Sequence, residues 1–156
     1  MFGAISREEQ ARKDNAETLE RKVMIVDDQS FNIDAALVIF NTKLKFDTEK
    51  YCSLAYDGQE AFDKVVRNVE AHQGRNCSYE LILMDCNMPF VDGYKATEKI
   101  REYLYSQGLE QPIITALTGH CEPDYVRKAI KVGMNQVMSK PLQKELLRKL
   151  VKKLEL

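Results

Sequence analysis

The sequence has little that would place the chain in a membrane or outside a cell. No apolar run approaches the length of a membrane-spanning helix, and the N-terminus lacks the apolar stretch of a signal peptide. The four cysteines show neither CxxC spacing nor a disulfide-dense pattern, and the two histidines lie apart from paired cysteines. These absences argue against a zinc site and predict a reducing, cytoplasmic location.

An excess of charge of one sign is also absent. The sequence has 23 Lys and Arg residues against 24 Asp and Glu residues, a formal net charge of −1. No general field therefore attracts nucleic acid or an acidic membrane surface, and we expect no direct contact with either. Hydrophobic residues make up 44% and charged residues 30% of the 156 residues, which is typical of one globular domain with a single core.

The chain divides near residue 21. Residues 1–21 are polar and charged and carry no continuous apolar stripe, so they are predicted to form an N-terminal linker or leader segment, which could include a helix. Residues 22–156 follow one regular pattern and are predicted to form the folded domain. Within them, short apolar segments typical of strands buried on both faces lie at 23–26, 51–55, 81–84, 113–117 and 136–138. Each is followed by apolar residues at helical spacing, and this alternation predicts an α/β domain with a parallel sheet and helices on both faces.

Local chemistry predicts three helix boundaries. Ser30 is placed as the N-cap of the helix after the first strand. Asp57 and Glu60, three residues apart, resemble a capping box at the start of the next helix. Gly133 is predicted to end the helix that precedes the fifth strand.

Polar side chains collect where the predicted strands end. Asp27 and Asp28 follow the first strand, Asp85 the third, Thr118 the fourth and Lys140 the fifth. Ligands of open α/β sheets bind beyond the carboxyl ends of the strands, so these residues are expected to share one site. Carboxylates at the ends of buried strands are costly unless a cation pairs with them.

A hard divalent cation would balance these carboxylates. Mg²⁺ prefers oxygen ligands, and Mn²⁺ accepts the same donors. Asp28 and Asp85 are expected to bind the metal directly and Asp27 through water, with a backbone carbonyl just past Asp85 as a further ligand. Lys140 suits one anionic oxygen of a substrate, and the Thr118 hydroxyl suits another.

This set of groups suits transfer of a phosphoryl group to a carboxylate. Aspartate is a competent nucleophile for covalent phosphorylation. The transition state requires positioning and charge neutralisation more than acid–base chemistry. Because Asp85 is expected to be ionised at neutral pH, no general base is needed.

The motifs resemble the receiver domain of two-component response regulators over residues 22–154. The matching pieces, in order and at the ends of the expected strands, are Val26–Asp28, Leu83–Pro89, Asp92–Gly93, Ala116–Gly119 and Ser139–Pro141. Each is weak alone, and together they are specific. The resemblance implies a single-domain, flavodoxin-like (βα)5 fold, doubly wound, with five parallel strands in the order 2-1-3-4-5. It also implies a phosphoprotein of phosphorelay signal transduction that catalyses its own phosphorylation and dephosphorylation rather than acting as an enzyme on other substrates.

The resemblance implies a role for each site residue. Asp85 matches the phosphorylated aspartate, and Asp27 and Asp28 match the acidic pair that organises Mg²⁺. Asn87 matches the position that gives a backbone carbonyl to the metal. Thr118 matches the switch hydroxyl that turns toward the phosphoryl group.

Three further positions complete this comparison. Lys140 matches the lysine of the family and is expected to precede a cis peptide bond to Pro141. Asn87 and His120 match positions that flank the phosphoryl group and tune its hydrolysis, although an exposed loop histidine is an equally good interpretation of His120. Val137 departs from the family, which often has Tyr or Phe there. Because a short β-branched side chain cannot swing as a ring can, we expect an altered or weaker signal around the fourth and fifth helices.

The sequence is similar in particular to receivers of eukaryotic hybrid histidine kinases, through Asp85–Pro89, Gly133–Gln136 and Asn32. This implies a histidine kinase or a histidine phosphotransfer protein as the partner. No DNA-binding output domain follows the last predicted helix, so the chain is expected to be a stand-alone regulator or a receiver from a larger kinase.

Two alternative functions fit the same residue types less well. A pseudo-receiver that acts only by binding would not need the complete set of site residues. A phosphohydrolase of the haloacid dehalogenase type also uses an aspartate nucleophile and Mg²⁺, but it typically has Asp-x-Asp after the first strand, whereas this chain has Asp27 and Asp28 followed by Gln29. Binding of a flavodoxin-type cofactor is weaker still, because no phosphate loop follows the first strand.

Overall fold

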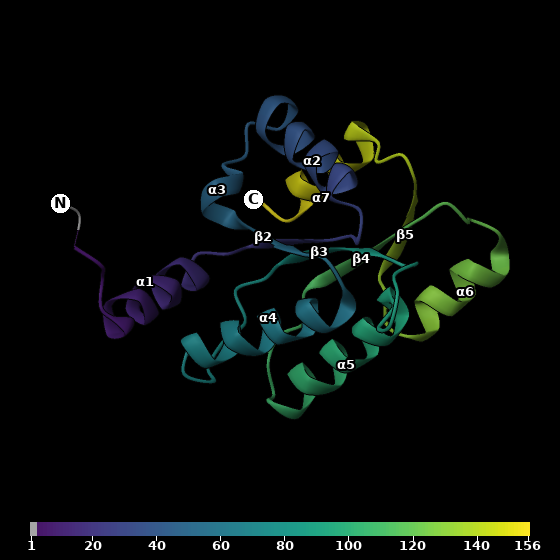
Figure 1. Ribbon diagram of the computed structural model, residues 1–156. Helices are drawn as coiled ribbons and strands as arrows, with labels where there is room; N and C mark the ends of the chain where they lie inside the picture. The colour runs from purple at the N-terminus through teal and green to yellow at the C-terminus, as the bar shows by residue number, and fades with distance from the viewer. Residues whose placement is uncertain (1–2) are drawn as a thin grey trace.

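The computed structural model describes residues 3–156 and shows a sheet of parallel strands between two layers of helices (Figure 1). The five strands are hydrogen-bonded in the order β2-β1-β3-β4-β5. Their bounds are β1 (Val23–Val26), β2 (Cys52–Ala55), β3 (Leu81–Asp85), β4 (Ile113–Thr118) and β5 (Gln136–Ser139). The predicted α/β class, the doubly wound topology and the strand order are confirmed.

Helices cover both faces of this sheet, as the ribbon shows (Figure 1). One face packs against α2 (Ser30–Val38), the π-helical turn η1 (Ile39–Lys43) and α7 (Lys144–Lys153). The other face packs against α4 (Gly58–Ala71), α5 (Gly93–Ser106) and α6 (Pro123–Lys131). The short helix α3 (Thr48–Tyr51) leads directly into β2. Among the described residues, no helix has the combination of length and apolar character needed to cross a bilayer.

The continuous apolar strands follow from this two-sided burial. In β1, Met24 packs into the core on the α4 side, and Ile25 packs into the core on the α2 side. In β3, Ile82 and Leu83 divide in the same way, and all four side chains are at most 1% exposed. A strand with alternating polar residues would place polar groups in one of these two cores, where they would lack water.

Two details of the strand and helix boundaries differ from the prediction. β2 begins at Cys52 rather than at residue 51, because residues 48–51 form a helical turn that the Asp47 side chain caps through the amide of Lys50. The prediction that Ser30 is the N-cap of α2 was wrong. Ser30 is the first helical residue, and Gln29 is at the cap position. The reason is that the Asp27 carboxylate accepts the Gln29 N–H and shapes the entry into α2.

The other two helix boundaries agree with local chemistry. The Asp57 side chain accepts the amide hydrogen of Glu60 at 2.7 Å, as an N-cap does. The Glu60 carboxylate accepts from the amide of Tyr56, one residue before the cap, so the reciprocal bond of a capping box is shifted by one position. Gly133 has φ +104°, a conformation that favours glycine, and α6 ends two residues earlier.

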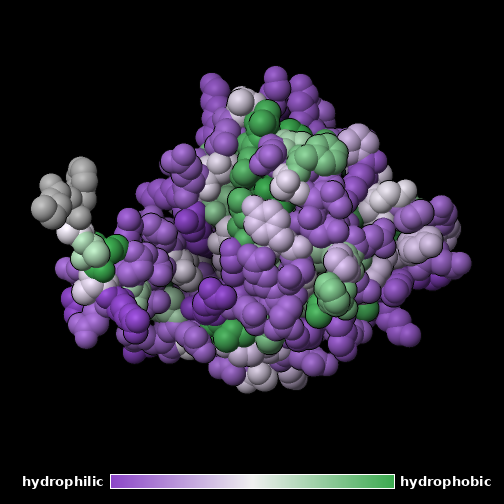
Figure 2. Space-filling view, in the orientation of Figure 1, coloured by the Kyte–Doolittle hydropathy of each residue, from purple (hydrophilic) through white to green (hydrophobic). Residues whose placement is uncertain are grey.

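Residues 7–19 form helix α1, which begins with a capping box between Ser6 and Glu9. No side chain of α1 is buried, and the surface over this described helix is largely hydrophilic (Figure 2). Hydrogen bonds at its C-terminal end attach it to the domain instead. The fully buried Asn68 of α4 donates its amide to the carbonyl of Thr18 at 2.9 Å. The hydroxyl of Ser78 donates to the carbonyl of Arg21.

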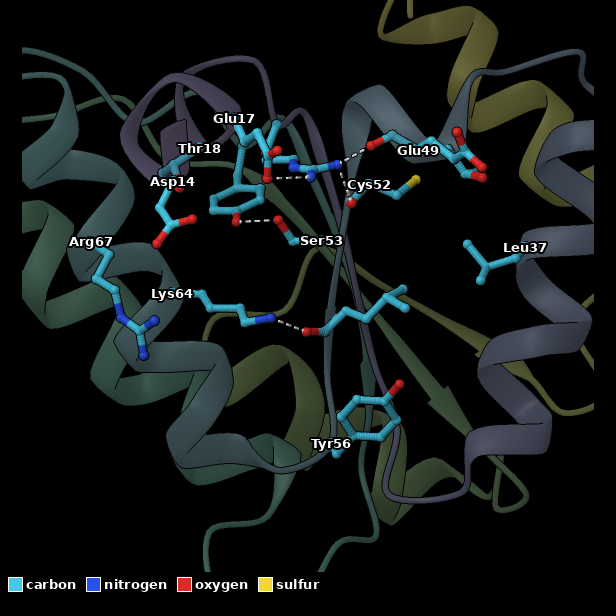
Figure 3. A pocket seen from close by; sticks show the side chains of 14 residues that line it. Asp14, Glu17, Thr18, Leu37, Glu49, Cys52, Ser53, Tyr56, Lys64 and Arg67 are labelled. Carbon is cyan, nitrogen blue, oxygen red and sulfur yellow. Dashed lines mark hydrogen bonds and ion pairs between the residues drawn. The ribbon is translucent and has the colours of Figure 1, made fainter. Parts of the chain in front are cut away.

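A pocket of about 620 Å³ lies where α1, β2 and α4 meet (Figure 3). The free edge of β2 borders this pocket, and side chains donate hydrogen bonds to the backbone carbonyls that β2 points outward. Arg21 donates to the carbonyl of Cys52 at 2.9 Å, and the Lys64 ammonium donates to that of Leu54. These contacts protect the edge against pairing with another strand, which is a common hazard of exposed edges. The pocket lies apart from the strand ends where the chemistry collects.

Candidate phosphoacceptor and metal site

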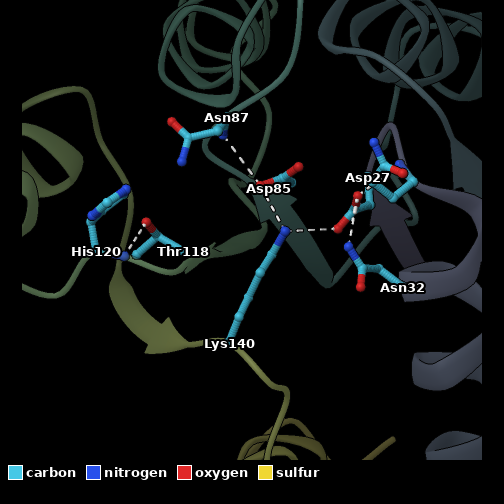
Figure 4. Close-up of polar contacts among 8 residues, drawn as sticks. Asp27, Asn32, Asp85, Asn87, Thr118, His120 and Lys140 are labelled. Carbon is cyan, nitrogen blue, oxygen red and sulfur yellow. Dashed lines mark hydrogen bonds and ion pairs between the residues drawn. The ribbon is translucent and has the colours of Figure 1, made fainter.

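Polar side chains from four strand ends meet at the carboxyl edge of the sheet (Figure 4). Asp27 and Asp28 directly follow β1, and Asp85 is the last residue of β3. Thr118 ends β4, and Lys140 directly follows β5. The structure therefore places all five predicted site residues at one edge. This placement follows from the parallel topology, in which all strands end on the same side.

Three carboxylates are close enough to share one cation. Asp27, Asp28 and Asp85 each offer an oxygen, and these oxygens lie within 4.8 Å of one another. Asp27 and Asp85 are each 2% exposed, and Asp28 is half-buried. The mutual repulsion of clustered, poorly hydrated carboxylates is unfavourable, and a positive charge between them offsets it. Hard oxygen donors of this kind fit Mg²⁺, which commonly binds through one or two carboxylates.

Lys140 provides the protein's own positive charge at this position. Its ammonium lies 3.1 Å from an oxygen of Asp27 and 3.1 Å from an oxygen of Asp85. Partial burial disfavours the charged ammonium, but the hydrogen bonds to Asp85 and Asp27 outweigh this and raise the pKa of Lys140. The Lys140 amide also donates to the carbonyl of Thr118, which holds the end of β5 beside β4. The Lys140–Pro141 bond is cis, as expected.

The environment of Asp85 disfavours its charge in the metal-free protein. Burial raises the pKa of Asp85 to about 6, and the hydrogen bond from Lys140 opposes this rise without cancelling it. The neighbouring charge of Asp27 raises the value further. At neutral pH the carboxylate still predominates, so the nucleophilic form is available.

This raised pKa predicts that metal-free protein loses stability as pH rises. Folded Asp85 has a pKa of about 6 against an ordinary value of 3.8, so the folded state binds this proton more tightly than the unfolded state does. Its contribution to the free energy of unfolding is complete below the ordinary value and disappears as pH rises through about 6. Asp85→Asn, which cannot ionise, is therefore expected to be more stable than the parent near neutral pH, with a smaller difference at acidic pH.

Urea unfolding with EDTA, at several pH values across this window, measures the difference. A gap between Asp85→Asn and the parent that stays constant with pH would contradict the assignment of the raised pKa to Asp85.

Asn87 and His120 lie beside the two strand ends, as their sequence positions require. The amide of Asn87 donates to an oxygen of Asp85 at 3.2 Å, and the Asn87 side chain is exposed. The amide of His120 donates to the hydroxyl oxygen of Thr118 at 3.0 Å. The His120 ring stacks on Tyr125 with the ring centroids 4.9 Å apart. The backbone N–H of each residue thus holds a side chain of the site, Asp85 or Thr118, while its own side chain lies at the rim of the site (Figure 4).

Val137 is half-buried in β5 and packs against the core on the α4 side. It forms the pair with Ala116 of β4 in the sheet register. Position 137 therefore carries an aliphatic side chain on the same face of the sheet as Ala116.

Two contributors to the site carried no assigned role in the sequence analysis. The Asn32 amide donates to Asp27 at 3.3 Å. A Cβ on Gly93 would lie 2.1 Å from the carbonyl oxygen of Asp85, so only glycine permits α5 to begin this close to the phosphoacceptor strand. Gly93 belongs to the Asp92–Gly93 motif that the sequence analysis quoted, but the sequence did not show that glycine is needed for close packing against Asp85. The role of Asn32 depends on a contact with Asp27 that sequence spacing alone does not predict.

Fold and site together define a receiver-type domain, and comparison with known proteins agrees. The model of the response regulator receiver domain family matches residues 23–152, and the chain belongs to this family. Among curated relatives, the osmosensing histidine protein kinase SLN1 of Saccharomyces cerevisiae is 35% identical over 123 residues, which is 79% of this chain and 9% of SLN1. Hybrid signal transduction histidine kinase B of Dictyostelium discoideum is 33% identical over 141 residues, which is 85% of this chain and 6% of that kinase.

Solved receiver structures are similar over most of the chain. The receiver domain of the histidine kinase CKI1 from Arabidopsis thaliana, complexed with Mg²⁺ and BeF3⁻, is 28% identical with a TM-score of 0.68 and covers 92% of this chain and 95% of its own. The receiver of Ssk1 from Saccharomyces cerevisiae, in complex with the histidine phosphotransfer protein Ypd1, is 30% identical with a TM-score of 0.66 and covers 86% of this chain and 88% of its own. The sequence interpretation as a receiver of the hybrid histidine kinase type is confirmed. This chain spans about 9% of the length of the first curated relatives.

Proposed function

We propose that this chain accepts a phosphoryl group on Asp85 from a phosphohistidine donor, in a Mg²⁺-dependent reaction, and then changes conformation. The observation that carries this proposal is the buried carboxylate of Asp85, held 3.1 Å from the Lys140 ammonium and within 4.8 Å of the oxygens of Asp27 and Asp28. A buried aspartate with a cation beside it and a metal-type oxygen cluster around it is suited to charge-stabilised phosphoryl transfer.

The residues that would hold Mg²⁺ are Asp28 and Asp85 directly, Asp27 through water, and the backbone carbonyl of Asn87. The Mg²⁺ complex of the similar CKI1 receiver supports a Mg²⁺ site in this chain. When bound, the metal supplies positive charge that neutralises phosphoryl oxygens. Mn²⁺ is proposed as a substitute, because it accepts the same oxygen donors.

In the transfer, an oxygen of Asp85 forms a bond to phosphorus while the bond between phosphorus and the donor histidine nitrogen breaks. The histidine nitrogen keeps the electron pair, and Asp85 becomes an acyl phosphate. No proton has to leave Asp85, since the carboxylate is the reacting form. The Lys140 ammonium moves from sharing Asp27 and Asp85 to binding a phosphoryl oxygen as a compact charge.

We propose that the hydroxyl of Thr118 responds to phosphorylation by forming a hydrogen bond to the phosphoryl group. It accepts the His120 amide in the structure, and a hydroxyl that accepts one hydrogen bond can also donate its own hydrogen, here to a phosphoryl oxygen. Phosphorylation adds roughly −1.5 to −2 charges at neutral pH, and a turn of Thr118 toward that charge would shift the β4–α6 loop. Because Val137 cannot follow this movement as a ring would, we propose an altered or weaker signal at the face of α6 and α7.

We propose a histidine kinase or a histidine phosphotransfer protein as the donor, which the complex of Ypd1 with the Ssk1 receiver supports. The chain would act in the cytoplasm, alone or as part of a hybrid histidine kinase. Residues 1–21 would serve as an N-terminal linker or leader segment of the domain at 22–156. Hydrolysis of the phosphoaspartate by water would reset the module.

The test is the intact mass of the protein after incubation with acetyl phosphate, with and without Mg²⁺. A gain of one phosphoryl group that requires Mg²⁺ supports the proposal. A folded protein that gains no mass from acetyl phosphate and none from a phosphorylated histidine phosphotransfer protein would leave a binding-only receiver as the function.

His120 is expected to control how long the phosphoryl group persists. His120→Ala keeps the backbone bond to Thr118 but removes the ring beside it (Figure 4), and we expect this to give water easier access to the phosphoryl group. The lifetime of the phosphoaspartate is expected to fall several-fold. Loss of the added mass with time measures it, and His72→Ala, at the C-cap of α4 and away from the site, is the matched histidine control. An unchanged lifetime would leave His120 as an ordinary loop residue.

A further inference from the structure

The Asp27 carboxylate divides its two oxygens between two different tasks. One oxygen, Oδ1, accepts the Gln29 amide at 2.9 Å and the Asn32 side-chain amide at 3.3 Å. The other, Oδ2, accepts the Lys140 ammonium at 3.1 Å and faces Asp85 (Figure 4). Both donors to Oδ1 come from the entry of α2, whereas Oδ2 is the oxygen that accepts from the site lysine.

The two donors to Oδ1 are not equivalent. The donor of Gln29 is its backbone N–H, which stays in place when a side chain at this or a neighbouring position is substituted. Asn32 is half-buried on the first turn of α2, and its side-chain amide donates to Oδ1 of Asp27. Without it, Oδ1 would keep one donor and the carboxylate would be freer to rotate. Groups of this kind, which orient a ligand without touching the metal, commonly change metal affinity by about 10- to 100-fold.

We infer that Asn32 is a positioning residue for the Mg²⁺ site: its amide holds Asp27 so that Oδ2 faces the metal position. This inference rests on the metal site of the proposed function and adds a residue to it. Asn32 does not bind the metal or the phosphoryl group and acts only through Asp27. The role requires a donor at residue 32, which an amide supplies and neither an aliphatic side chain nor a carboxylate does.

The first test measures binding of MgCl2 by isothermal titration calorimetry, in the absence of any phosphoryl donor. Asn32→Leu has a similar volume and no donor, and it is expected to weaken Mg²⁺ binding by about 10-fold. Ala35→Leu, an exposed position on the same helix, is the matched control and is expected to bind as the parent does. Equal Mg²⁺ affinity of Asn32→Leu and the parent would overturn the inference and leave the proposed function in place.

A double-mutant cycle separates positioning through Asp27 from a general structural effect. In an Asp27→Asn background, the orientation of the carboxylate no longer matters, so Asn32→Leu is expected to cause little further loss of Mg²⁺ affinity. The same 10-fold loss in both backgrounds would overturn the role, because the effect would then not pass through Asp27. Urea unfolding of each variant shows that the fold is intact.

Asn32→Asp distinguishes orientation from electrostatics. It removes the donor and adds a carboxylate near Asp27, so positioning predicts weaker Mg²⁺ binding, whereas simple charge attraction predicts tighter binding. Tighter binding would therefore overturn the inference. If the parent binds no Mg²⁺, the inference and the metal site fail together. If Asn32 governs Mg²⁺ affinity but the parent accepts no phosphoryl group, only the proposed function fails.

Discussion

Asp85→Asn is expected to abolish acceptance of a phosphoryl group from acetyl phosphate and from a phosphorylated histidine phosphotransfer protein. The amide has nearly the same shape as the carboxylate and keeps the position at the end of β3, but its oxygen is not an anionic nucleophile. The raised pKa of Asp85, about 6, does not weaken this prediction, because the carboxylate predominates at neutral pH. Intact mass measures the result, which is expected to be loss of the added phosphoryl group to below detection.

The control for this experiment is Asp34→Asn, which changes an exposed carboxylate on α2. It is expected to accept as the parent does. If Asp85→Asn still gained one phosphoryl group in a Mg²⁺-dependent manner, Asp85 would not be the acceptor. Peptide mapping of the modified chain would then locate the true acceptor.

Lys140→Ala is expected to separate metal binding from phosphoryl transfer. The three carboxylates that cluster within 4.8 Å remain, so Mg²⁺ should bind as tightly as in the parent or more tightly, because the ammonium no longer competes for oxygens of Asp27 and Asp85. Acceptance should fall by about 10²-fold or more, the usual loss when one group that stabilises transition-state charge is removed. Calorimetry with MgCl2 and the time course of mass gain measure the two effects.

Lys144→Ala, an exposed lysine at the start of α7, is the matched control. Parent-like acceptance by Lys140→Ala would show that its charge is not used in transfer. A parallel loss of Mg²⁺ binding would show instead that Lys140 organises the carboxylates rather than the phosphoryl group.

The sheet could be predicted because the strands are buried on both faces. Segments such as Leu81–Met84 are apolar without interruption, and the structure buries every one of their side chains between two helical layers. Turn chemistry was similarly local: Asp57 caps α4, and Gly133 ends α6 with a positive φ. These features depend on neighbours within a few residues, which the sequence displays directly.

Features that depend on distant partners could not be predicted in this way. The N-cap of α2 was misplaced at Ser30, which is the first helical residue, because the carboxylate of Asp27, already a site residue, accepts the N–H of Gln29 and places Gln29 at the cap position. The attachment of α1 depends on the buried Asn68 amide, which is 50 residues from its partner Thr18. Neither the polar surface of α1 nor its spacing indicates that contact.

By itself, the sequence determined the strand–helix alternation, the family and the identities of the side chains at the strand ends, because apolar periodicity and short motifs are local. Tertiary structure decided how those side chains interact: Lys140 between Asp27 and Asp85, the raised pKa of Asp85, and the amide of Asn32 on Asp27. The physical reason is that burial and distance between groups far apart in the chain set electrostatic interactions, and only the folded sheet brings residues 27, 85 and 140 to one edge.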